Sequence, residues 1–183
     1  MTEIVHFVGL GSMGLGMAQS ALRAGFETYG HDPDAGRREL LVAAGGRLLD
    51  RASPKAEVLV CVVLNAAQTR DALFGAQGWA EGVQAGGVIL GCATVAPEFA
   101  REMEAEAARR GLLYLDAPIS GGAVKAAEGR LSVMASGRAE AFGRAEAVLA
   151  ALAETVHRLG DCAGPGSAMK AVNQLLAGVH IAA

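Results

Sequence analysis

The stretch IVHFVGLGSMG, residues 4–14, decides the fold of this 183-residue chain. Its first half is apolar and rich in β-branched residues, which predicts a strand over residues 4–10. Glycines then recur in the pattern GxGxxG, and an Ala-rich helix is expected over residues 12–25. A glycine turn that joins a strand directly to a helix is typical of the first unit of a doubly wound α/β sheet.

The rest of the chain repeats this alternation of strands and helices. Short apolar runs predict strands, and the longer Ala-rich runs between them predict helices. The expected strands cover residues 26–32, 58–64, 87–90, 112–118, 131–137 and 155–160, and the expected helices cover 34–44, 66–75, 97–111 and 140–153. We therefore predict an α/β fold, a doubly wound (Rossmann) and mostly parallel sheet.

The composition limits the classes of function. Apolar residues make up 52% of the chain, charged residues 19%, and the formal net charge is −3, which is typical of a soluble globular protein without a basic face for nucleic acid. No apolar run approaches the roughly 20 residues that span a bilayer. The three cysteines form no CxxC pair and the four histidines lack metal-ligand spacing. We expect a cytoplasmic protein with no metal, no nucleic-acid partner and no membrane association.

The glycine pattern indicates a dinucleotide site. Its first glycine permits a tight turn, the second lets the backbone approach a pyrophosphate, and the third lets the helix pack against the strand. The N–H groups at the start of that helix then face the phosphates. Because the chain has 25 glycines, the position of the pattern between a strand and a helix is the stronger evidence. The predicted cofactor-binding residues of this turn are Gly9, Leu10, Gly11, Ser12, Met13 and Gly14.

The end of the second expected strand indicates which dinucleotide binds. His31 and Asp32 stand there, 18 residues beyond the last glycine of the pattern. A carboxylate at this place accepts hydrogen bonds from ribose hydroxyls and repels the additional phosphate of NADP, so NAD is the favoured cofactor. Arg37 and Arg38 follow in the next helix and are expected to be solvated. The alternative for Asp32 is a helix N-cap or turn residue.

Two later motifs suggest a reaction site. The Ser-Gly-Gly turn at residues 120–122 follows an expected strand and offers a hydroxyl and bare backbone N–H groups to a carboxylate. A tight turn that needs positive φ is the alternative. Lys170, Asn173 and Gln174 share one face of the last expected helix. A lysine beside a carboxamide can move a proton to or from a substrate hydroxyl, although a lone helical lysine is usually solvated.

These motifs together resemble those of the β-hydroxyacid dehydrogenase family, which includes 3-hydroxyisobutyrate dehydrogenase. GLGSMGLGMA (9–18) is similar to the family's dinucleotide motif, DAPISGG (116–122) to its substrate motif, and GPGSAMKAVNQ (164–174) to its GxGxxxKxxN catalytic motif. The three occur in the family's order and cover nearly the whole chain. An S-adenosylmethionine methyltransferase also uses a glycine loop and an acid after the second strand. This alternative does not explain the two later motifs.

The resemblance implies NAD-dependent oxidation of a small hydroxy acid and assigns roles to residues. Lys170 would be the general acid/base and Asn173 its orienting partner in the substrate site. The substrate carboxylate would be held by Ser120, Gly121 and Gly122. Further cofactor contacts are implied at Leu64, Asn65 and Thr94.

Three further stretches are similar to the L-threonate dehydrogenase subgroup, whose members oxidise the C2 hydroxyl of a four-carbon sugar acid. They are NAAQT (65–69), GGAVKAAEG (121–129) and QLLAGVHIAA (174–183). The chain also departs from the family. Gly91 and Ala93 stand where the family often has Asp and Ser, and Gln174 replaces a second asparagine. Residues 47–60 are short for the family and are expected to lack a helix between two strands.

The domain division is expected near GDCAGPGS, residues 160–167, where the alternation gives way to a helical segment. We expect residues 1–160 to form the NAD-binding Rossmann domain and residues 161–183 to form the first part of a long interdomain helix. That helix reaches the last residue without a C-cap, so we expect it to be truncated, and the resemblance implies a missing all-helical C-terminal domain. Because catalysis depends on a closed, dry site that positions the substrate, we expect this chain to bind NAD but to show weak or absent turnover. The alternative to an enzyme is a truncated NAD-binding module with little or no turnover, a homo-oligomer assembled through this exposed helix.

Overall fold

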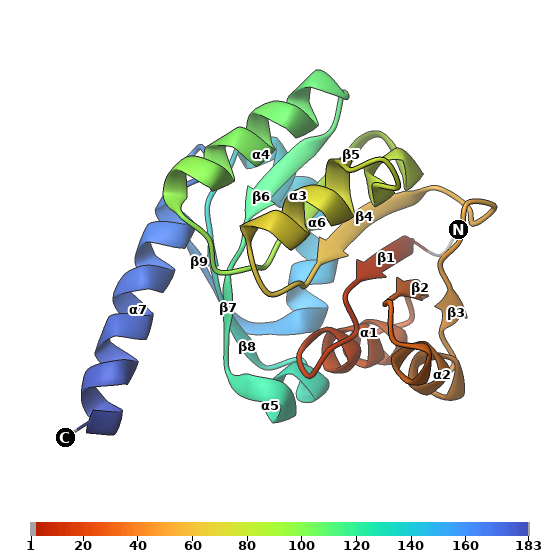
Figure 1. The fold of residues 1–183 in the computed structure, drawn as a ribbon, viewed down its shortest axis with the longest axis horizontal. Coiled ribbons are helices and arrows are strands. Elements are labelled where there is room, and N and C mark those ends of the chain that lie inside the picture. The colour runs from red at the N-terminus through yellow and green to blue at the C-terminus, as the bar shows by residue number, and fades with distance from the viewer. Residues whose placement is uncertain (1–2, 183) are drawn as a thin grey trace.

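A six-stranded parallel sheet forms the centre of the computed structural model, which describes residues 3–182. The strand order is β3-β2-β1-β4-β5-β6, so the chain steps outward in one direction from β1 and then returns to build outward in the other (Figure 1). This arrangement confirms the predicted doubly wound fold, whose ligands bind beyond the carboxyl ends of the strands where the order reverses. The strands are β1 (Ile4–Val8), β2 (Glu27–His31), β3 (Arg47–Leu48), β4 (Ala56–Cys61), β5 (Val83–Gly91) and β6 (Leu113–Asp116).

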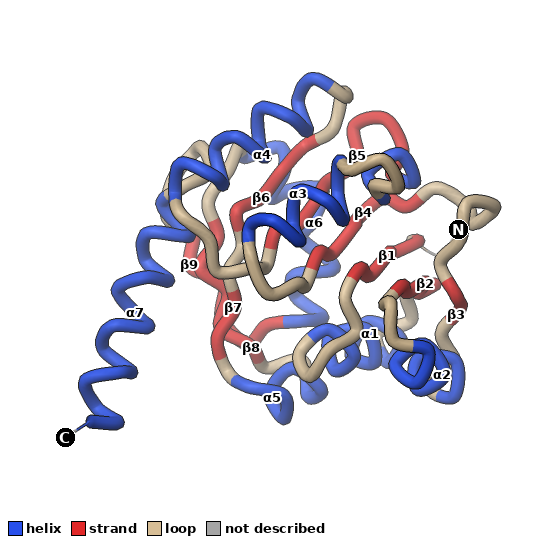
Figure 2. Tube along the Cα trace, in the orientation of Figure 1, coloured by secondary structure: helices blue, strands red, loops and turns tan. Residues whose placement is uncertain are grey.

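Helices cover both faces of the sheet (Figure 2). One hydrophobic core joins the sheet to α1 (Gly14–Arg23), α2 (Ala35–Ala43) and α6 (Ala139–Leu152). The other core joins the opposite face to α3 (Ala66–Phe74), the short 3₁₀ helix η1 (Trp79–Gly82) and α4 (Pro97–Arg109). Because both faces are covered, strands such as β4 are apolar almost throughout. No helix separates β3 from β4, as expected from the short segment between them.

A second, smaller sheet corrects one prediction. The strands expected over 131–137 and 155–160 do not join the main sheet; they are β8 (Leu131–Ala135) and β9 (Ala153–Arg158) of a three-stranded sheet, with β7 (Ile119–Ser120) antiparallel to β8. The physical reason lies after β6, where Pro118 has no N–H to continue the ladder and the chain turns away. The helix α5 (Gly122–Glu128), which follows β7, was not predicted.

The last helix, α7 (Pro165–Ala182), begins against β6, β8 and α4 and then extends away from the body of the molecule (Figure 1). Met169, Val172 and Leu175 on it are exposed. It occupies the segment predicted as an interdomain helix, of which Ala183 lies outside the described residues. The division at residue 160 stays a prediction.

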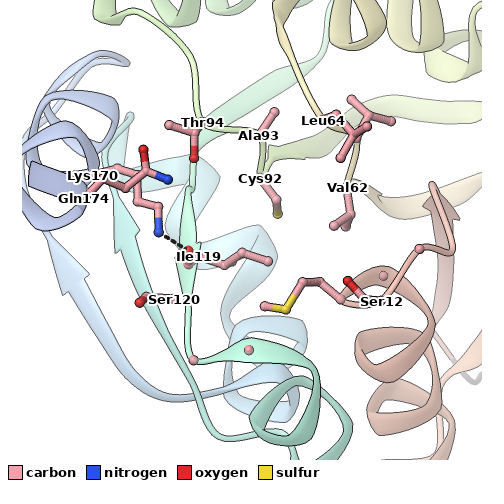
Figure 3. A pocket seen from close by; sticks show the side chains of 16 residues that line it. Ser12, Val62, Leu64, Cys92, Ala93, Thr94, Ile119, Ser120, Lys170 and Gln174 are labelled. Atoms are coloured by element: carbon pink, nitrogen blue, oxygen red, sulfur yellow. Dashed lines mark hydrogen bonds between the residues drawn. The ribbon is translucent and has the colours of Figure 1, made fainter. Parts of the chain in front are cut away.

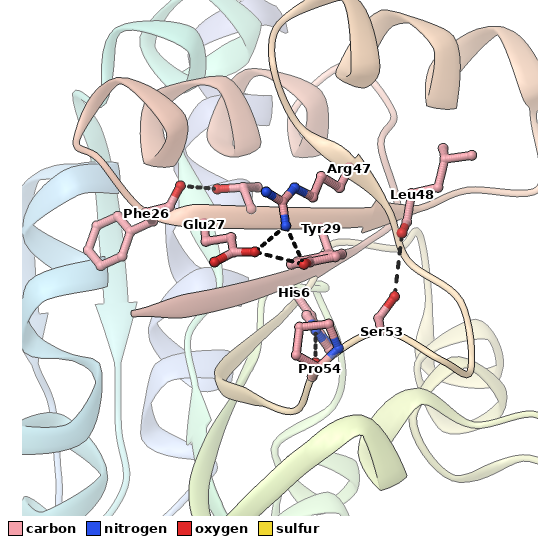
Figure 4. Close-up of polar contacts among 9 residues, drawn as sticks. His6, Phe26, Glu27, Tyr29, Arg47, Leu48, Ser53 and Pro54 are labelled. Carbon is pink, nitrogen blue, oxygen red and sulfur yellow. Dashed lines mark hydrogen bonds and ion pairs between the residues drawn. The ribbon is translucent and has the colours of Figure 1, made fainter. Parts of the chain in front are cut away.

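Polar side chains hold the edge of the main sheet together (Figure 4). Arg47 on β3 pairs with Glu27 on β2 and donates to the Tyr29 hydroxyl at 2.9 Å. Deeper in the sheet, the His6 Nε2 lies 3.0 Å from the Pro54 carbonyl, whereas its Nδ1 has no hydrogen-bond partner in the part of the chain that the structure describes. Burial lowers the pKa of His6 to about 4, so the ring is neutral at physiological pH.

Candidate active site

Two adjoining cavities lie beyond the carboxyl ends of β1, β4 and β5. The first has a volume of about 420 Å³ and is lined by residues of the glycine turn, the Ser-Gly-Gly turn and the start of α7. The second, of about 550 Å³, is lined by Asp32, His31 and Trp79 among others. Gly11 and residues 62–64 line both cavities. One elongated ligand can therefore occupy both, with its middle over Gly11.

The glycine turn is built so that the backbone stays bare at its centre. Gly9 has φ +93°, and a Cβ there would lie 2.1 Å from the Val62 carbonyl oxygen. A Cβ on Gly14 would lie 1.9 Å from the carbonyl oxygen of Gly9, so both glycines are required by the fold. A Cβ on Gly11 would meet nothing within 4 Å. Gly11 therefore faces open space at the junction of the cavities.

Asp32 anchors the turn as well as lining the second cavity. Its Oδ2 accepts from the Leu10 N–H at 2.7 Å and its Oδ1 from the Asp34 N–H at 2.9 Å. The cap of α2 is Asp34, whose side chain accepts from the Gly36 N–H at 2.8 Å. Asp32 is thus a turn residue without being the helix cap, and its carboxylate reaches the cavity wall.

Arg38, which was expected to be solvated, is half-buried and hydrogen-bonded. Its guanidinium donates to the carbonyl oxygens of Asp32 at 2.5 Å and Pro33 at 3.0 Å. Because both carbonyls belong to the turn after β2, the side chain folds back over the start of α2. This places a positive charge beside the turn that carries Asp32.

An aromatic wall of the second cavity is formed by His31, which the sequence predicted as a cofactor contact, and Trp79, which it did not. The rings of His31 and Trp79 lie 4.6 Å apart, and the Arg51 guanidinium lies 4.3 Å from the Trp79 ring centre on its face. Burial and the nearby Arg38 lower the pKa of His31, so the ring favours its neutral form. The available signal was that Trp79 is the chain's single tryptophan. Its place in the fold could not be inferred from the surrounding pattern.

Lys170 faces the first cavity from α7 (Figure 3). Its side chain is held down, with Nζ donating to the Ile119 carbonyl of β7 at 2.8 Å and only 8% of the residue exposed. It is the one charged side chain among the described residues that line this cavity. Burial lowers its pKa from the ordinary 10.5, which favours the uncharged amine.

The carboxamides beside Lys170 are arranged differently from one another. Gln174 lines the cavity with Lys170, four residues earlier on the same helix. Asn173 is exposed and is not among the lining residues. The structure therefore brings Gln174 to the lysine, while the role predicted for Asn173 stays a prediction.

The Ser-Gly-Gly turn lines the same cavity as Lys170 and follows directly after Ile119, whose carbonyl holds the amine. Ser120 ends β7, and Gly121 and Gly122 have φ of +139° and +77°. The positive φ values confirm that this segment is a tight turn that favours glycine. Its position on the cavity wall also supports the prediction that it binds a ligand. The space beside Gly122 is open, because a Cβ there would meet nothing within 4 Å.

The remaining predicted residues divide into two groups. Leu64 lines both cavities and Thr94 lines the first. Asn65 lines neither; its side chain instead caps α3 by accepting from the Gln68 N–H at 2.9 Å. Its predicted cofactor contact stays a prediction. Within the described residues, no group of three or more His, Cys, Asp or Glu side chains could hold a metal, and no helix has the length and apolarity to cross a membrane.

Residues 4–160 match the family model described as the NAD binding domain of 6-phosphogluconate dehydrogenase. The chain belongs to this family of NAD-binding domains. It is 47% identical, over its whole length, to an L-threonate dehydrogenase of Cupriavidus necator and 35% identical to a 3-hydroxyisobutyrate dehydrogenase of Pseudomonas aeruginosa. It covers 63% and 61% of those two proteins, so the chain spans less than two thirds of these curated relatives.

The fold of this NAD-binding domain is also that of a solved relative. A crystal structure of 3-hydroxyisobutyrate dehydrogenase from Salmonella typhimurium superposes with a TM-score of 0.92 at 44% identity, covering 98% of this chain and 64% of that one. The similarity to β-hydroxyacid dehydrogenases that the motifs indicated is thereby confirmed.

The residues present fit the cofactor of such a domain. The bare backbone at Gly11 can approach a pyrophosphate, and the first turn of α1 carries no acid that would repel it. The second cavity offers a carboxylate and an aromatic wall to an adenosine, while the first offers Lys170 at the other end. These features fit a dinucleotide that spans both cavities.

Proposed function

We propose that the chain forms the cofactor half of an NAD-dependent hydroxy-acid dehydrogenase, and that its substrate is L-threonate, oxidised at C2. The observation that carries this proposal is the pair of cavities that share Gly11 in their lining, with Asp32 in one and Lys170 and the Ser-Gly-Gly turn in the other. A hydroxy acid needs a carboxylate anchor and a proton acceptor close together. The first cavity offers both.

The proposed chemistry divides the work between cofactor and chain. NAD, when bound, supplies the nicotinamide ring that accepts a hydride. The Ser120 hydroxyl and the backbone N–H groups of Gly121 and Gly122 bind the substrate carboxylate and so orient its C2 hydroxyl. Lys170, as the neutral amine, accepts the proton of that hydroxyl. Loss of one hydride and one proton leaves a carbonyl at C2.

The choice of substrate rests on the relatives. The L-threonate dehydrogenase of Cupriavidus necator is more similar to this chain than the 3-hydroxyisobutyrate dehydrogenase of Pseudomonas aeruginosa. The test is NADH formation with L-threonate, D-erythronate and 3-hydroxyisobutyrate as alternative substrates. A clear preference for L-threonate is expected, and a preference for 3-hydroxyisobutyrate would overturn the substrate assignment.

A second candidate is an NAD-binding module that turns over little and assembles with another copy through α7. It is favoured by the exposure of Met169, Val172 and Leu175, at 44%, 52% and 69%. Apolar side chains that project together from a helix commonly mark an interaction surface. The molar mass from light scattering separates the cases: a dimer that Val172→Glu dissociates supports assembly through α7, and a monomer contradicts it.

A cytoplasmic location is part of the proposal. The three cysteines are free thiols in the structure, with Cys61 and Cys92 buried and Cys162 exposed. Free thiols persist in a reducing compartment. Burial also raises the pKa of Cys61 to about 12, so this thiol stays protonated.

A further inference from the structure

A buried polar cluster lies directly behind the lysine's helix. Asp116 at the end of β6 is 1% exposed, and Ser136 and Ser167 are fully buried. The Asp116 Oδ1 accepts from the Ser167 hydroxyl at 2.6 Å, and the Ser136 hydroxyl lies 3.3 Å from Oδ2. The backbones of Asp116 and Ser136 are also joined, through an isolated bridge between the two sheets.

The cluster binds the N–H groups at the start of α7. Asp116 Oδ2 accepts from the Gly164 N–H at 3.0 Å and the Ser167 N–H at 2.8 Å, and the Ser136 hydroxyl oxygen accepts from the Gly166 N–H at 2.9 Å. These are groups that a helix leaves without an internal partner. The first turn of α7 has no acid of its own. Asp116 therefore supplies, from another element, the negative charge that stabilises a helix N-terminus.

The same two segments meet again at Lys170. Ser167 and Lys170 are three residues apart on α7. Their partners are also three residues apart, with Asp116 at the end of β6 and Ile119 at the start of β7. The first turn of α7 also packs closely against β8, because a Cβ on Gly166 would lie 2.4 Å from the Met134 carbonyl oxygen. A rotation of the first turn of α7 would therefore move Nζ away from the Ile119 carbonyl.

We propose that Asp116, together with Ser136 and Ser167, is the positioning device for Lys170: it fixes the first turn of α7 so that the amine stays buried and faces the first cavity. The significance of Lys170 rests on the function proposed above. The positioning itself is a property of the fold and is measurable without turnover.

The test measures how fast each lysine amine reacts with acetic anhydride as a function of pH, by mass spectrometry of peptides. The chain has three lysines, and the exposed Lys55 and Lys125 serve as internal references. In Asp116→Ala, Lys170 is expected to react roughly tenfold faster, because the bonds that hold α7 are lost. Its apparent pKa is expected to rise toward the ordinary value, because the amine becomes hydrated.

Two further variants separate positioning from general stability. Asp116→Asn keeps a carbonyl oxygen for the N–H groups of α7 and is expected to restore most of the protection of Lys170. Glu104→Ala is the matched control for Asp116→Ala: the Glu104 carboxylate accepts from the Ala163 N–H at 3.2 Å, in the same connection but outside the helix, and its loss is expected to leave Lys170 unchanged.

The proposal is overturned if folded Asp116→Ala protein shows Lys170 with unchanged reactivity and pKa. If that variant does not fold, Ser167→Ala, which removes only the hydroxyl bond to Oδ1, gives the decision, with faster labelling of Lys170 expected and unchanged labelling overturning the proposal. Failure of the proposed function is recognised separately, since it would appear as NADH formation that does not depend on Lys170 while the labelling pattern stays as expected.

Discussion

At the scale of single residues, Lys170 combines a buried position, a single hydrogen bond to a carbonyl and a lowered pKa. The sequence identified this residue through its motif, and the helical spacing correctly placed Gln174 on the same face. The residues that hold the start of its helix could not be predicted in the same way. Asp116 and Ser136 are 51 and 31 residues before Ser167, and only the folded topology brings their side chains together.

The lowered pKa of Lys170 predicts the pH dependence of oxidation. The amine must be neutral to accept the hydroxyl proton, so kcat/KM is expected to rise with pH through a midpoint below the ordinary 10.5. Initial rates of NADH formation across pH measure the midpoint. A midpoint at or above the ordinary value, or a profile that Lys170→Ala leaves unchanged, would rule out this residue as the base.

The cofactor preference is predicted to depend on Asp32. Asp32→Asn removes the charge that repels an additional phosphate but keeps an oxygen for the Leu10 N–H, so the ratio of NADP to NAD dissociation constants is expected to fall about tenfold. Arg38 lies beside the turn and would favour a phosphate once the charge is gone. Asp34→Asn, at the helix cap outside the cavity, is the control. An unchanged ratio in Asp32→Asn would show that another residue sets the preference.

At the scale of elements, the long periodic segments were predictable and the short ones were not. The strand expected at 58–64 and the helix expected at 97–111 are observed as β4 and α4 with small shifts at their ends. The two-residue strands β3 and β7 and the seven-residue α5 are too short to show a period. Apolar patterning also does not say which sheet a strand joins, so β8 and β9 were assigned to the wrong one.

The departure at Gly91 has a physical reason at this scale. A Cβ at this position, the end of β5, would lie 1.9 Å from the Tyr114 hydroxyl oxygen of the neighbouring β6. Tyr114 is buried and fills the space that a side chain at position 91 would need. The glycine and the tyrosine are therefore matched across the two strands, and a side chain at one requires a smaller residue at the other.

The buried His6 on β1 predicts acid sensitivity of the fold. Its folded pKa, about 4, lies below the ordinary 6.5, so the unfolded chain binds more protons between these values and stability falls as pH falls through that window. The loss is on the order of 3 kcal/mol, after the hydrogen bond to Pro54 and, more weakly, the charge of Glu57 have offset part of the effect of burial. Urea unfolding at several pH values measures it. His6→Gln should flatten the dependence; an equally steep dependence in that variant would assign the effect to other groups.

At the scale of the whole molecule, the reversal of strand order beside β1 brings the early glycine turn and the late lysine helix to the same edge of the sheet. Motif order in the sequence indicated that these parts act together, whereas the lining that the two cavities share at Gly11 is visible only in the structure. The aromatic wall at Trp79 likewise depends on the packing of η1 against β2 and its turn.

The most direct test of the central claim is NADH formation by this chain with NAD and L-threonate, compared between wild type and Lys170→Ala after calorimetry has shown that both bind NAD. We predict weak NADH formation by the wild type, because this chain is only the cofactor half of the proposed enzyme, and at least about a hundredfold less in the variant, with equal NAD affinity, as expected for loss of a general base. Equal, measurable rates in the two proteins would contradict the claim that Lys170 is the general base of a dehydrogenase site, and no NADH from a wild-type protein that binds NAD would favour the NAD-binding module instead.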